Sequence, residues 1–200
     1  MPNNRLLFAI TGASGMPLAY ALLRSFRKIP DLDIHLIISH NAKEVLNNEV
    51  KIPNLQALAQ QSYKPDEWTA PPASGSWQAY GMIICPCSMA SLAAIATGVG
   101  SNLIHRAADV TLKERRPLII IPRETPLNTI HLTNMLRLAK AGATIMPFMP
   151  AYYTKLPDLN ALMQNFAGRV LDQFHIAHSL CKRWREDITV PEEMIEEKRF

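Results

Sequence analysis

Two charged residues, Arg123 and Glu124, stand directly after a short apolar run and have the side chains best suited to chemistry. The run, residues 118–121, reads Leu-Ile-Ile-Ile and is typical of a strand buried on both faces of a parallel sheet. In open α/β sheets, ligands bind just beyond the carboxyl ends of the strands. A guanidinium and a carboxyl group at this place predict an anionic ligand and proton transfer. A surface salt bridge is the alternative that the spacing leaves open.

The segments on either side of this strand read as helices. Residues 107–116 hold good helix formers and no Gly or Pro until Pro117. Thr125-Pro126 resembles an N-cap followed by a first-turn proline, so we expect a helix over 126–141, closed by Gly142. The N-terminus of that helix would face the same ligand as Arg123 and Glu124.

A second candidate site is the turn Gly12-Ala13-Ser14-Gly15, between a predicted strand (5–11) and a predicted helix (17–28). Such a turn lets backbone N–H groups approach a phosphate at the helix N-terminus. The GxGxxG fingerprint and the Walker lysine are both missing, and the next strand (33–39) ends in Ser39, not in the acidic residue that holds an NAD ribose. The pattern favours a mononucleotide such as FMN, with a turn that serves packing only as the alternative.

Strands and helices alternate along the rest of the chain. Ser88 is a plausible N-cap for a helix of small residues, and Trp68 lies in a turn-rich loop where it could cover a ligand or simply pack. This pattern predicts a single doubly wound α/β domain with a mostly parallel, Rossmann-like sheet over residues 1–178, followed by a C-terminal arm, 179–200. The further expected elements are a helix at 41–48 ending near Glu49, a loop at 53–76, a strand at 80–85, a helix at 86–97, a strand at 143–146 and a helix at 159–174.

Composition narrows the function. The chain has 200 residues, 48% of them hydrophobic, and its net charge of +4 comes from scattered Lys and Arg, which favours small anionic ligands over nucleic acid. No apolar run has the length of a membrane helix, and three cysteines fit a reducing compartment, so we expect a cytoplasmic protein. Cys85 and Cys87 are interpreted as buried thiols, and His175 and His178 have no third ligand nearby in the sequence, so no metal is expected.

A set of motifs in a fixed order makes the chain resemble the flavin prenyltransferases of the UbiX type, formerly labelled aromatic-acid decarboxylases. The resemblance covers residues 6–176. The motifs are GASG (12–15), APPASGS (70–76), CPCS (85–88), RAADV (106–110), LKERR (112–116), PRETP (122–126) and PAYY (150–153).

The resemblance implies transfer of a dimethylallyl group from dimethylallyl monophosphate to N5 and C6 of reduced FMN, without a metal. It implies catalytic roles for Glu124 as acid/base, for Ser14 near flavin N5, and for Glu49 and Lys113 near the phosphate. It implies that the FMN-binding residues are Gly12, Ala13, Ser14, Ser39, Ser88, Met89, Ala90, Ser91 and Arg123. It implies that the prenyl phosphate is bound by Arg106, Lys113, Tyr153 and Arg169, with Trp68 and Trp184 lining the prenyl site.

The same resemblance implies a large homo-oligomer, commonly a dodecamer, with sites shared between subunits, and a UbiD-type decarboxylase that uses the prenylated FMN. Two alternatives stay open. A flavin-dependent cysteine decarboxylase shares the fold, but carries PASANT where this chain has PCSMAS (86–91). A non-catalytic flavin carrier would need none of the phosphate-binding residues.

Overall fold

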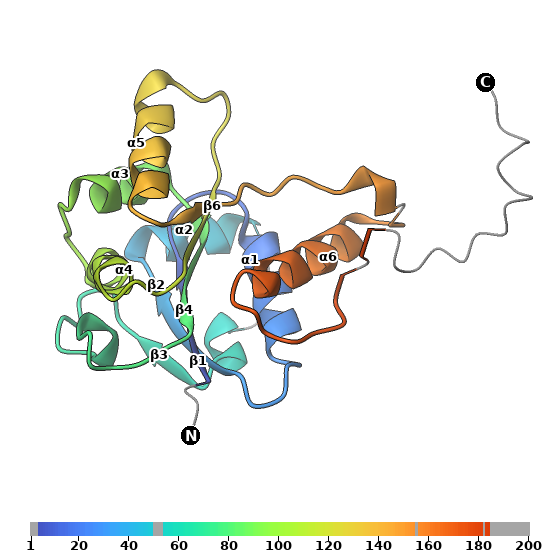
Figure 1. Cartoon of the computed structure of the whole chain (residues 1–200), viewed down its shortest axis with the longest axis horizontal. Helices are drawn as coiled ribbons and strands as arrows, with labels where there is room; N and C mark the ends of the chain where they lie inside the picture. The colour runs from blue at the N-terminus through green and yellow to red at the C-terminus, as the bar shows by residue number, and fades with distance from the viewer. Residues whose placement is uncertain (1–3, 50–53, 155, 182, 185–200) are drawn as a thin grey trace, which may run out of the picture.

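One six-stranded sheet organises the chain, and all its strand pairs are parallel (Figure 1). The computed structural model describes residues 4–49, 54–154, 156–181, 183 and 184. The strand order is β3-β2-β1-β4-β5-β6, which is the doubly wound arrangement expected from the sequence. The strands are β1 (Arg5–Ile10), β2 (Asp33–Ile38), β3 (Gln61–Tyr63), β4 (Gly81–Cys87), β5 (Leu118–Pro122) and β6 (Thr144–Ile145).

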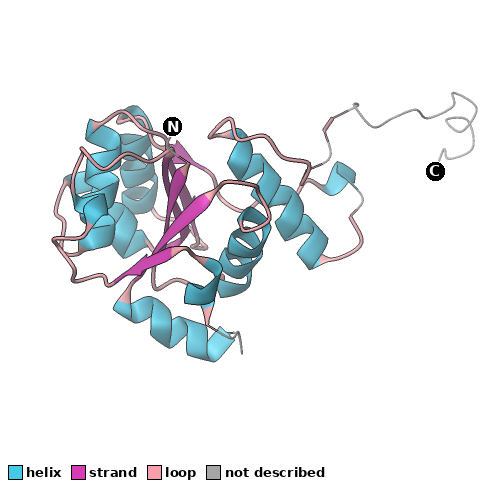
Figure 2. Ribbon diagram, turned by 90° about the horizontal axis from the view of Figure 1, so that it is seen from below, coloured by secondary structure: helices cyan, strands magenta, loops and turns pink. Residues whose placement is uncertain are grey.

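Helices cover both faces of the sheet, as the view along its edge shows (Figure 2). On one face, α1 (Met16–Phe26), α2 (His40–Glu49) and α6 (Leu159–Asp172) pack in one apolar cluster. On the other face, α3 (Met89–Thr97), α4 (Leu103–Lys113) and α5 (Thr129–Lys140) pack over a second cluster. Residues that alternate along β5 divide between the two clusters, with Ile119 and Ile121 in the first and Ile120 in the second. Burial on both faces explains the unbroken apolar runs of the central strands.

Strand β3 is a strand that the sequence does not predict. Its three residues, Gln-Ser-Tyr, pair with β2 at one edge of the sheet, inside the segment expected to be a loop. An edge strand buries little on its outer side, so it needs no apolar run.

Cys85 and Cys87 are fully buried at the end of β4, which confirms their interpretation as buried thiols. Burial raises the pKa of Cys87 to about 12, so this thiol is not a reactive nucleophile. None of the helices in the described residues combines the length and the apolar character that crossing a membrane requires.

Candidate active site

A cavity of about 690 Å³ opens at the carboxyl ends of β1, β4 and β5. Its charged or polar lining residues are Ser14, Glu49, Arg123, Glu124 and Thr125, and the sequence identified the first four as site residues. Its remaining wall is mainly apolar, and includes Ile121, Phe148, Met149, Leu159 and Met163. The volume is that of a typical small-molecule site, and a few polar groups in an apolar wall fix the orientation of a ligand. The sequence assigned no role to Phe148 or Met163, although the Pro-flanked aromatic loop around Phe148 was a signal.

The carboxylate of Glu49 is bound at the N-terminus of α1. Its Oε2 accepts the N–H groups of Gly15 and Met16, each at 2.9 Å. Partial burial acts to raise the pKa of Glu49, but hydrogen bonds from Ser14, Gly15 and Met16 and the charge of Arg123 outweigh it and lower the pKa. Glu49 is therefore an ionised acceptor. The N–H groups that the glycine turn was expected to offer to a phosphate bind this internal carboxylate instead.

Arg123 and Glu124 are both exposed at the mouth of the cavity. The carboxylate of Glu124 accepts the N–H of Thr125 at 3.0 Å, and the backbone N–H of Arg123 donates to Cys87 O at 3.1 Å. Among the described residues, neither side chain belongs to an ion pair. Within the described part of the chain, the expected alternative of a surface salt bridge at this strand end is therefore not observed, and both groups stay available to a ligand.

The helix after this strand begins later than the sequence predicted. Helix α5 starts at Thr129, and its N-cap is Asn128, whose side chain accepts the N–H of His131 at 2.9 Å. His131 completes a capping box, so it stabilises the first turn of α5. Thr125-Pro126 is not the helix start, because the reciprocal Asn128–His131 bonds define the first turn three residues further on. Of the residues between Glu124 and this N-cap, Thr125 lies in the cavity wall.

A second cavity, of about 590 Å³, lies on the other side of the glycine turn. Five predicted FMN residues line it, and two others, Ser14 and Arg123, line the first cavity. The remaining two predicted FMN residues are Ala13 and Met89. Ala13 stands between Gly12, which lines the second cavity, and Ser14, which lines the first. Met89 is the first residue of α3. The lining includes Gly12, Ser39, Ser88, Ala90 and Ser91, together with Trp68 and His105.

Local packing explains why these residues meet. A Cβ on Gly12 would lie 2.6 Å from Cβ of Asn41, so only glycine lets α2 approach the turn this closely. The hydroxyl of Thr11 donates to Pro86 O at 2.8 Å and accepts the N–H of Ser88 at 2.7 Å, which ties the end of β1 to the end of β4. Ser88 then caps α3 through the N–H of Ser91, as predicted.

Two predicted phosphate ligands, Arg106 and Lys113, lie on α4. Arg106 donates to Ala73 O at 3.1 Å and pairs with Asp109 at 2.8 Å, and Lys113 pairs with Glu114. Both residues therefore lie on the face of the sheet that α3, α4 and α5 cover. Trp68 is 49% exposed and shares a small cavity of about 210 Å³ with Arg106.

The other predicted prenyl-phosphate residues lie on the opposite face. Arg169 is exposed on α6, and the rings of Tyr153 and Trp184 meet edge to face with centroids 4.8 Å apart. The sheet separates α6 from α4 (Figure 1). The six predicted substrate residues are therefore not brought together within one chain.

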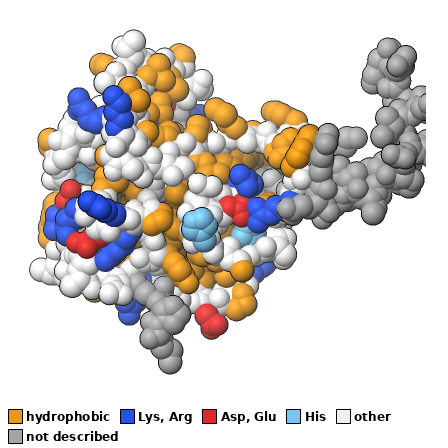
Figure 3. Space-filling model, in the orientation of Figure 1, with side chains coloured by type: hydrophobic (Ala, Val, Ile, Leu, Met, Phe, Trp, Pro, Cys, Tyr) orange, Lys and Arg blue, Asp and Glu red, His pale blue; other side chains and the backbone are white. Residues whose placement is uncertain are grey.

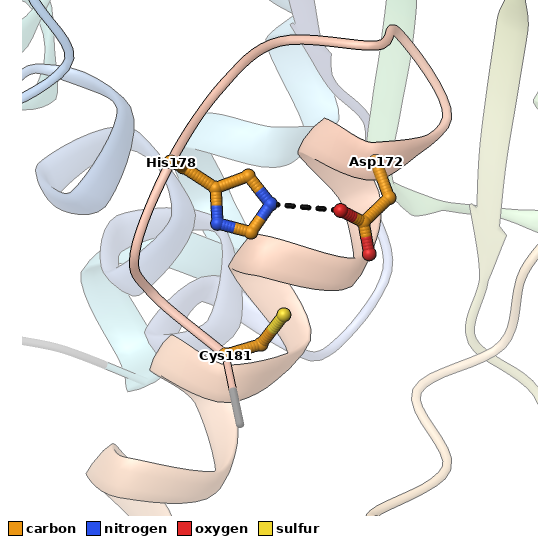
Figure 4. A group of neighbouring side chains, drawn as sticks. All are labelled: Asp172, His178 and Cys181. Carbon is orange, nitrogen blue, oxygen red and sulfur yellow. Dashed lines mark hydrogen bonds and ion pairs between the residues drawn. The ribbon is translucent and has the colours of Figure 1, made fainter. Parts of the chain in front are cut away.

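A cluster around Asp172, at the end of α6, is one that the sequence did not reveal (Figure 4). Asp172 Oδ1 accepts His178 Nε2 at 2.9 Å, and the Cys181 thiol lies close by, so His178 does have further metal-ligand types near it. However, both carboxylate oxygens also accept Arg183, at 2.6 and 2.7 Å, and Oδ2 accepts Arg169 at 2.6 Å. Burial acts to raise the pKa of Asp172, but the bonds from Arg183 and His178 lower it overall. The arrangement is a hydrogen-bonded ion cluster that orients Arg169.

Comparison with known proteins agrees with this geometry. The model of the Flavoprotein family matches residues 1–171. The flavin prenyltransferase LpdB of Lactiplantibacillus plantarum is 45% identical over 185 residues, which cover 92% of this chain and 99% of LpdB. The flavin prenyltransferase UbiX of Methanocaldococcus jannaschii is 44% identical over 90% of this chain and 98% of its own. This chain belongs to the UbiX-type flavin prenyltransferase family.

Solved structures of the flavin prenyltransferase family share the fold closely. AnUbiX (PadA1), crystallised with FMN and dimethylallyl pyrophosphate, has a TM-score of 0.87 and 41% identity over 91% of this chain and 97% of its own. A dodecameric FMN-dependent UbiX-like decarboxylase from Escherichia coli O157:H7 has a TM-score of 0.87 and 42% identity over 90% of this chain and 99% of its own. The peptidyl-cysteine decarboxylase EpiD, at 16% identity and a TM-score of 0.61, shares the fold alone.

Proposed function

We propose that this chain transfers a dimethylallyl group from dimethylallyl monophosphate to N5 and C6 of reduced FMN. The observation that carries the proposal is the first cavity, where Ser14, Glu49 and Glu124 face an apolar wall of the kind that a prenyl chain needs. Family membership and the two solved relatives support FMN as the flavin. The alternative of a cysteine decarboxylase rests on fold similarity alone.

The residues of the second cavity fit the sugar–phosphate part of FMN. Ser39, Ser88 and Asn102 each directly precede a helix, so the positive ends of α2, α3 and α4 converge on this cavity. Gly12 lets Asn41 of α2 pack closely against the turn between the two cavities. The reactive ring would then reach the first cavity, beside Ser14 and Arg123. When bound, the reduced flavin supplies the nucleophilic N5 and C6 positions.

The chain's own side chains would handle phosphate and protons. The C–O bond of the prenyl phosphate breaks and inorganic phosphate leaves, so Lys113 and Arg169 would stabilise the growing charge. Glu124 would donate a proton to the phosphate and regain one as the new bonds form. Ser14, hydrogen-bonded to the fixed carboxylate of Glu49, would hold its hydroxyl toward N5. Tyr153, Trp184 and Trp68 would present aromatic faces to an allylic cation.

A second copy of the chain is required if Lys113 and Arg169 bind one phosphate, because they lie on opposite faces of one sheet. Exposed apolar side chains on and beside α5 provide a surface for such a contact, and hydrophobic side chains gather over this helix in Figure 3. They are Leu127, Ile130, Leu132 and Leu136. We therefore propose a homo-oligomer, of the dodecameric kind seen in the relative from E. coli O157:H7.

A UbiD-type decarboxylase as the user of the product and the cytoplasm as the location stay predictions. The boundary at residue 178 between the α/β domain and the C-terminal arm also stays a prediction. Of the predicted arm, residue 182 and residues 185–200 lie outside the described part, and Arg183 contacts α6.

The deciding experiment is mass spectrometry of the flavin released after anaerobic incubation with reduced FMN and dimethylallyl monophosphate. A flavin heavier by one prenyl unit is expected. Unmodified FMN, also after a repeat with dimethylallyl pyrophosphate, would contradict prenyl transfer and favour the alternative of a non-catalytic flavin carrier. Absence of bound flavin would contradict the FMN site itself.

A further inference from the structure

Two arginines hold the loop of residues 73–77 against α4. The loop follows the short 3₁₀ helix η2 (Pro71–Ala73), which packs on α4. Arg106 Nε donates to Ala73 O at 3.1 Å. The half-buried Arg116, just after α4, donates from its two terminal nitrogens to Gly75 O and Trp77 O, each at 2.7 Å. A planar guanidinium that binds two carbonyl groups at once fixes both of them, so Arg116 determines where the backbone of residues 75–77 lies.

The fixed loop lies directly beside Lys113. A Cβ on Gly75 would lie 2.7 Å from Lys113 Nζ, and closer still to Glu114 Oε1. A residue without a side chain is therefore needed at position 75 if the ion pair between Lys113 and Glu114 is to form here. Both of these atoms are the ends of flexible side chains, so a methyl group on residue 75 would displace the ion pair and not the backbone. The position of Gly75 thus sets the position of the Lys113 ammonium.

Electrostatics couples the same residues. The hydrogen bond and the charge of Lys113, and to a smaller extent the charge of Arg116, lower the pKa of Glu114. Glu114 is therefore an anion near neutral pH, and it attracts the ammonium of Lys113 toward the loop. Arg116 and Lys113 are accordingly connected in two ways, through the backbone of Gly75 and through the field at Glu114.

We propose that Arg116 is a positioning residue for prenyl transfer, which fixes residues 73–77 and, through Gly75, holds the ammonium of Lys113 in place for the phosphate of dimethylallyl monophosphate. This inference rests on the proposed function, in which Lys113 binds that phosphate. Arg116 acts through Lys113 and not on the substrate, because its two terminal nitrogens already bind carbonyl oxygens. A lysine side chain that is held in one place loses less conformational entropy when it binds a phosphate.

Four substitutions separate positioning from charge. Arg116→Gln removes the guanidinium that binds the loop together with one charge, and Arg115→Gln removes the same charge from the neighbouring exposed residue. Arg116→Lys keeps the charge but has no planar fork with which to bind two carbonyl groups. Gly75→Ala leaves Arg116 unchanged and places a methyl group where the ion pair of Lys113 stands.

The measurement is kcat/KM for dimethylallyl monophosphate at saturating reduced FMN, together with the Kd of FMN. We expect Arg116→Gln, Arg116→Lys and Gly75→Ala to lower kcat/KM by about 5-fold to 10-fold, and Arg115→Gln to lower it by less than about 2-fold. The Kd of FMN should stay the same in all four variants. In a Lys113→Ala background, Arg116→Gln and Gly75→Ala should cost less than about a further 2-fold, since the group that they position is gone.

A readout that does not depend on turnover tests the first step by itself. Amide hydrogen exchange of residues 74–77 should be faster in Arg116→Gln than in the parent, because the loop has lost its anchor. Unchanged exchange would contradict the anchoring, whether or not the protein transfers a prenyl group.

The kinetic outcomes decide the remaining steps. A parent-like kcat/KM for Arg116→Gln would leave this residue a stabilising role alone, and a parent-like value for Arg116→Lys would assign the effect to charge. Equal losses in the parent and the Lys113→Ala backgrounds would mean that Arg116 does not act through Lys113. If thermal unfolding shows that Arg116→Gln is not folded, Gly75→Ala decides by the same comparison. A parent protein without any prenyl transfer would overturn the proposed function itself, and this role of Arg116 with it.

Discussion

The two halves of the proposed site are built in different ways. The groups for proton transfer, Ser14, Glu49 and Glu124, come from three separate segments and meet around one cavity of a single chain. The groups for binding the prenyl phosphate are divided, with Lys113 on one face of the sheet and Arg169 on the other.

This difference shows which part of the site one copy of the chain can form alone. Carboxyl ends of parallel strands meet at one edge of the sheet, so residues after β1 and β5 converge without help. Side chains on helices that cover opposite faces cannot converge through the sheet. With the proposed residue roles, the flavin part would be complete within a chain, and the phosphate part would require a second subunit.

The largest effect is expected from Glu124→Gln, which removes the acid at the edge of the first cavity. We expect kcat for prenyl transfer to fall by about 100-fold or more, as for loss of a general acid, while the Kd of FMN changes little. Mass-resolved product formation under saturating substrates measures the rate. Glu44→Gln, at an exposed position on α2, is the matched control. Normal turnover by Glu124→Gln would show that the proton comes from elsewhere.

The prenyl-phosphate half of the proposed site can be tested by combining two variants that are each weakly active. Lys113→Ala and Arg169→Ala should each reduce use of dimethylallyl monophosphate by more than about 10-fold, with a smaller effect on FMN binding. If one site takes Lys113 from one subunit and Arg169 from another, random co-assembly restores about a quarter of the sites. Activity after co-expression measures the restoration.

A mixture no more active than its components would mean that both residues act within one chain or that one of them does not bind phosphate. Equal loss of FMN and phosphate binding in Arg169→Ala would contradict the assignment of Arg169 to the prenyl phosphate.

Asp172→Asn should have a smaller effect, because Asp172 acts on the substrate through Arg169. We expect the KM for dimethylallyl monophosphate to rise by about 10-fold with FMN binding unchanged. In the Arg169→Ala background the same substitution should add little, since the group that it positions is gone. Asp158→Asn, at the N-cap of the same helix, is the control, because Asn caps as well as Asp. Additive effects of the two substitutions would contradict positioning and leave only a stabilising role.

The sequence predicts well those features that depend on local pattern. The buried run at 118–121 became β5, Leu118–Pro122, and the small-residue helix after Ser88 became α3, because apolar runs and N-caps act over a few residues. Arg123 and Glu124 were placed correctly, because the end of a parallel strand defines a ligand edge.

Features that depend on distant residues were missed. Asp172 receives His178 and Arg183 only because the chain folds back on α6, and a Cβ on Gly168 would lie 2.8 Å from Cβ of Cys181 in that contact. Strand β3 carries no apolar pattern of its own and forms by pairing with β2. The bonds that join Arg116 to the loop of residues 73–77 were likewise overlooked, since their partners are 39 and 41 positions apart in the sequence.

The smallest effect is expected from Glu49→Gln, which removes the internal anion at the N-terminus of α1. At pH 7 we expect a loss of about 1 kcal/mol in the free energy of unfolding, or a Tm lower by about 2–4 °C, since the helix end favours negative charge. The pKa of Glu49 in the folded protein lies below its ordinary value of 4.5. Its stabilisation is therefore complete above about pH 4.5 and is lost as the pH falls through the folded pKa.

Tm measured from pH 7 down to acid should accordingly converge for the parent and Glu49→Gln, while the exposed control Glu44→Gln follows the parent throughout. An unchanged Tm at pH 7 would mean that the N–H groups of Gly15 and Met16 do not depend on Glu49. The N-terminus of α1 would then be open to a ligand phosphate, which the glycine turn was first expected to bind.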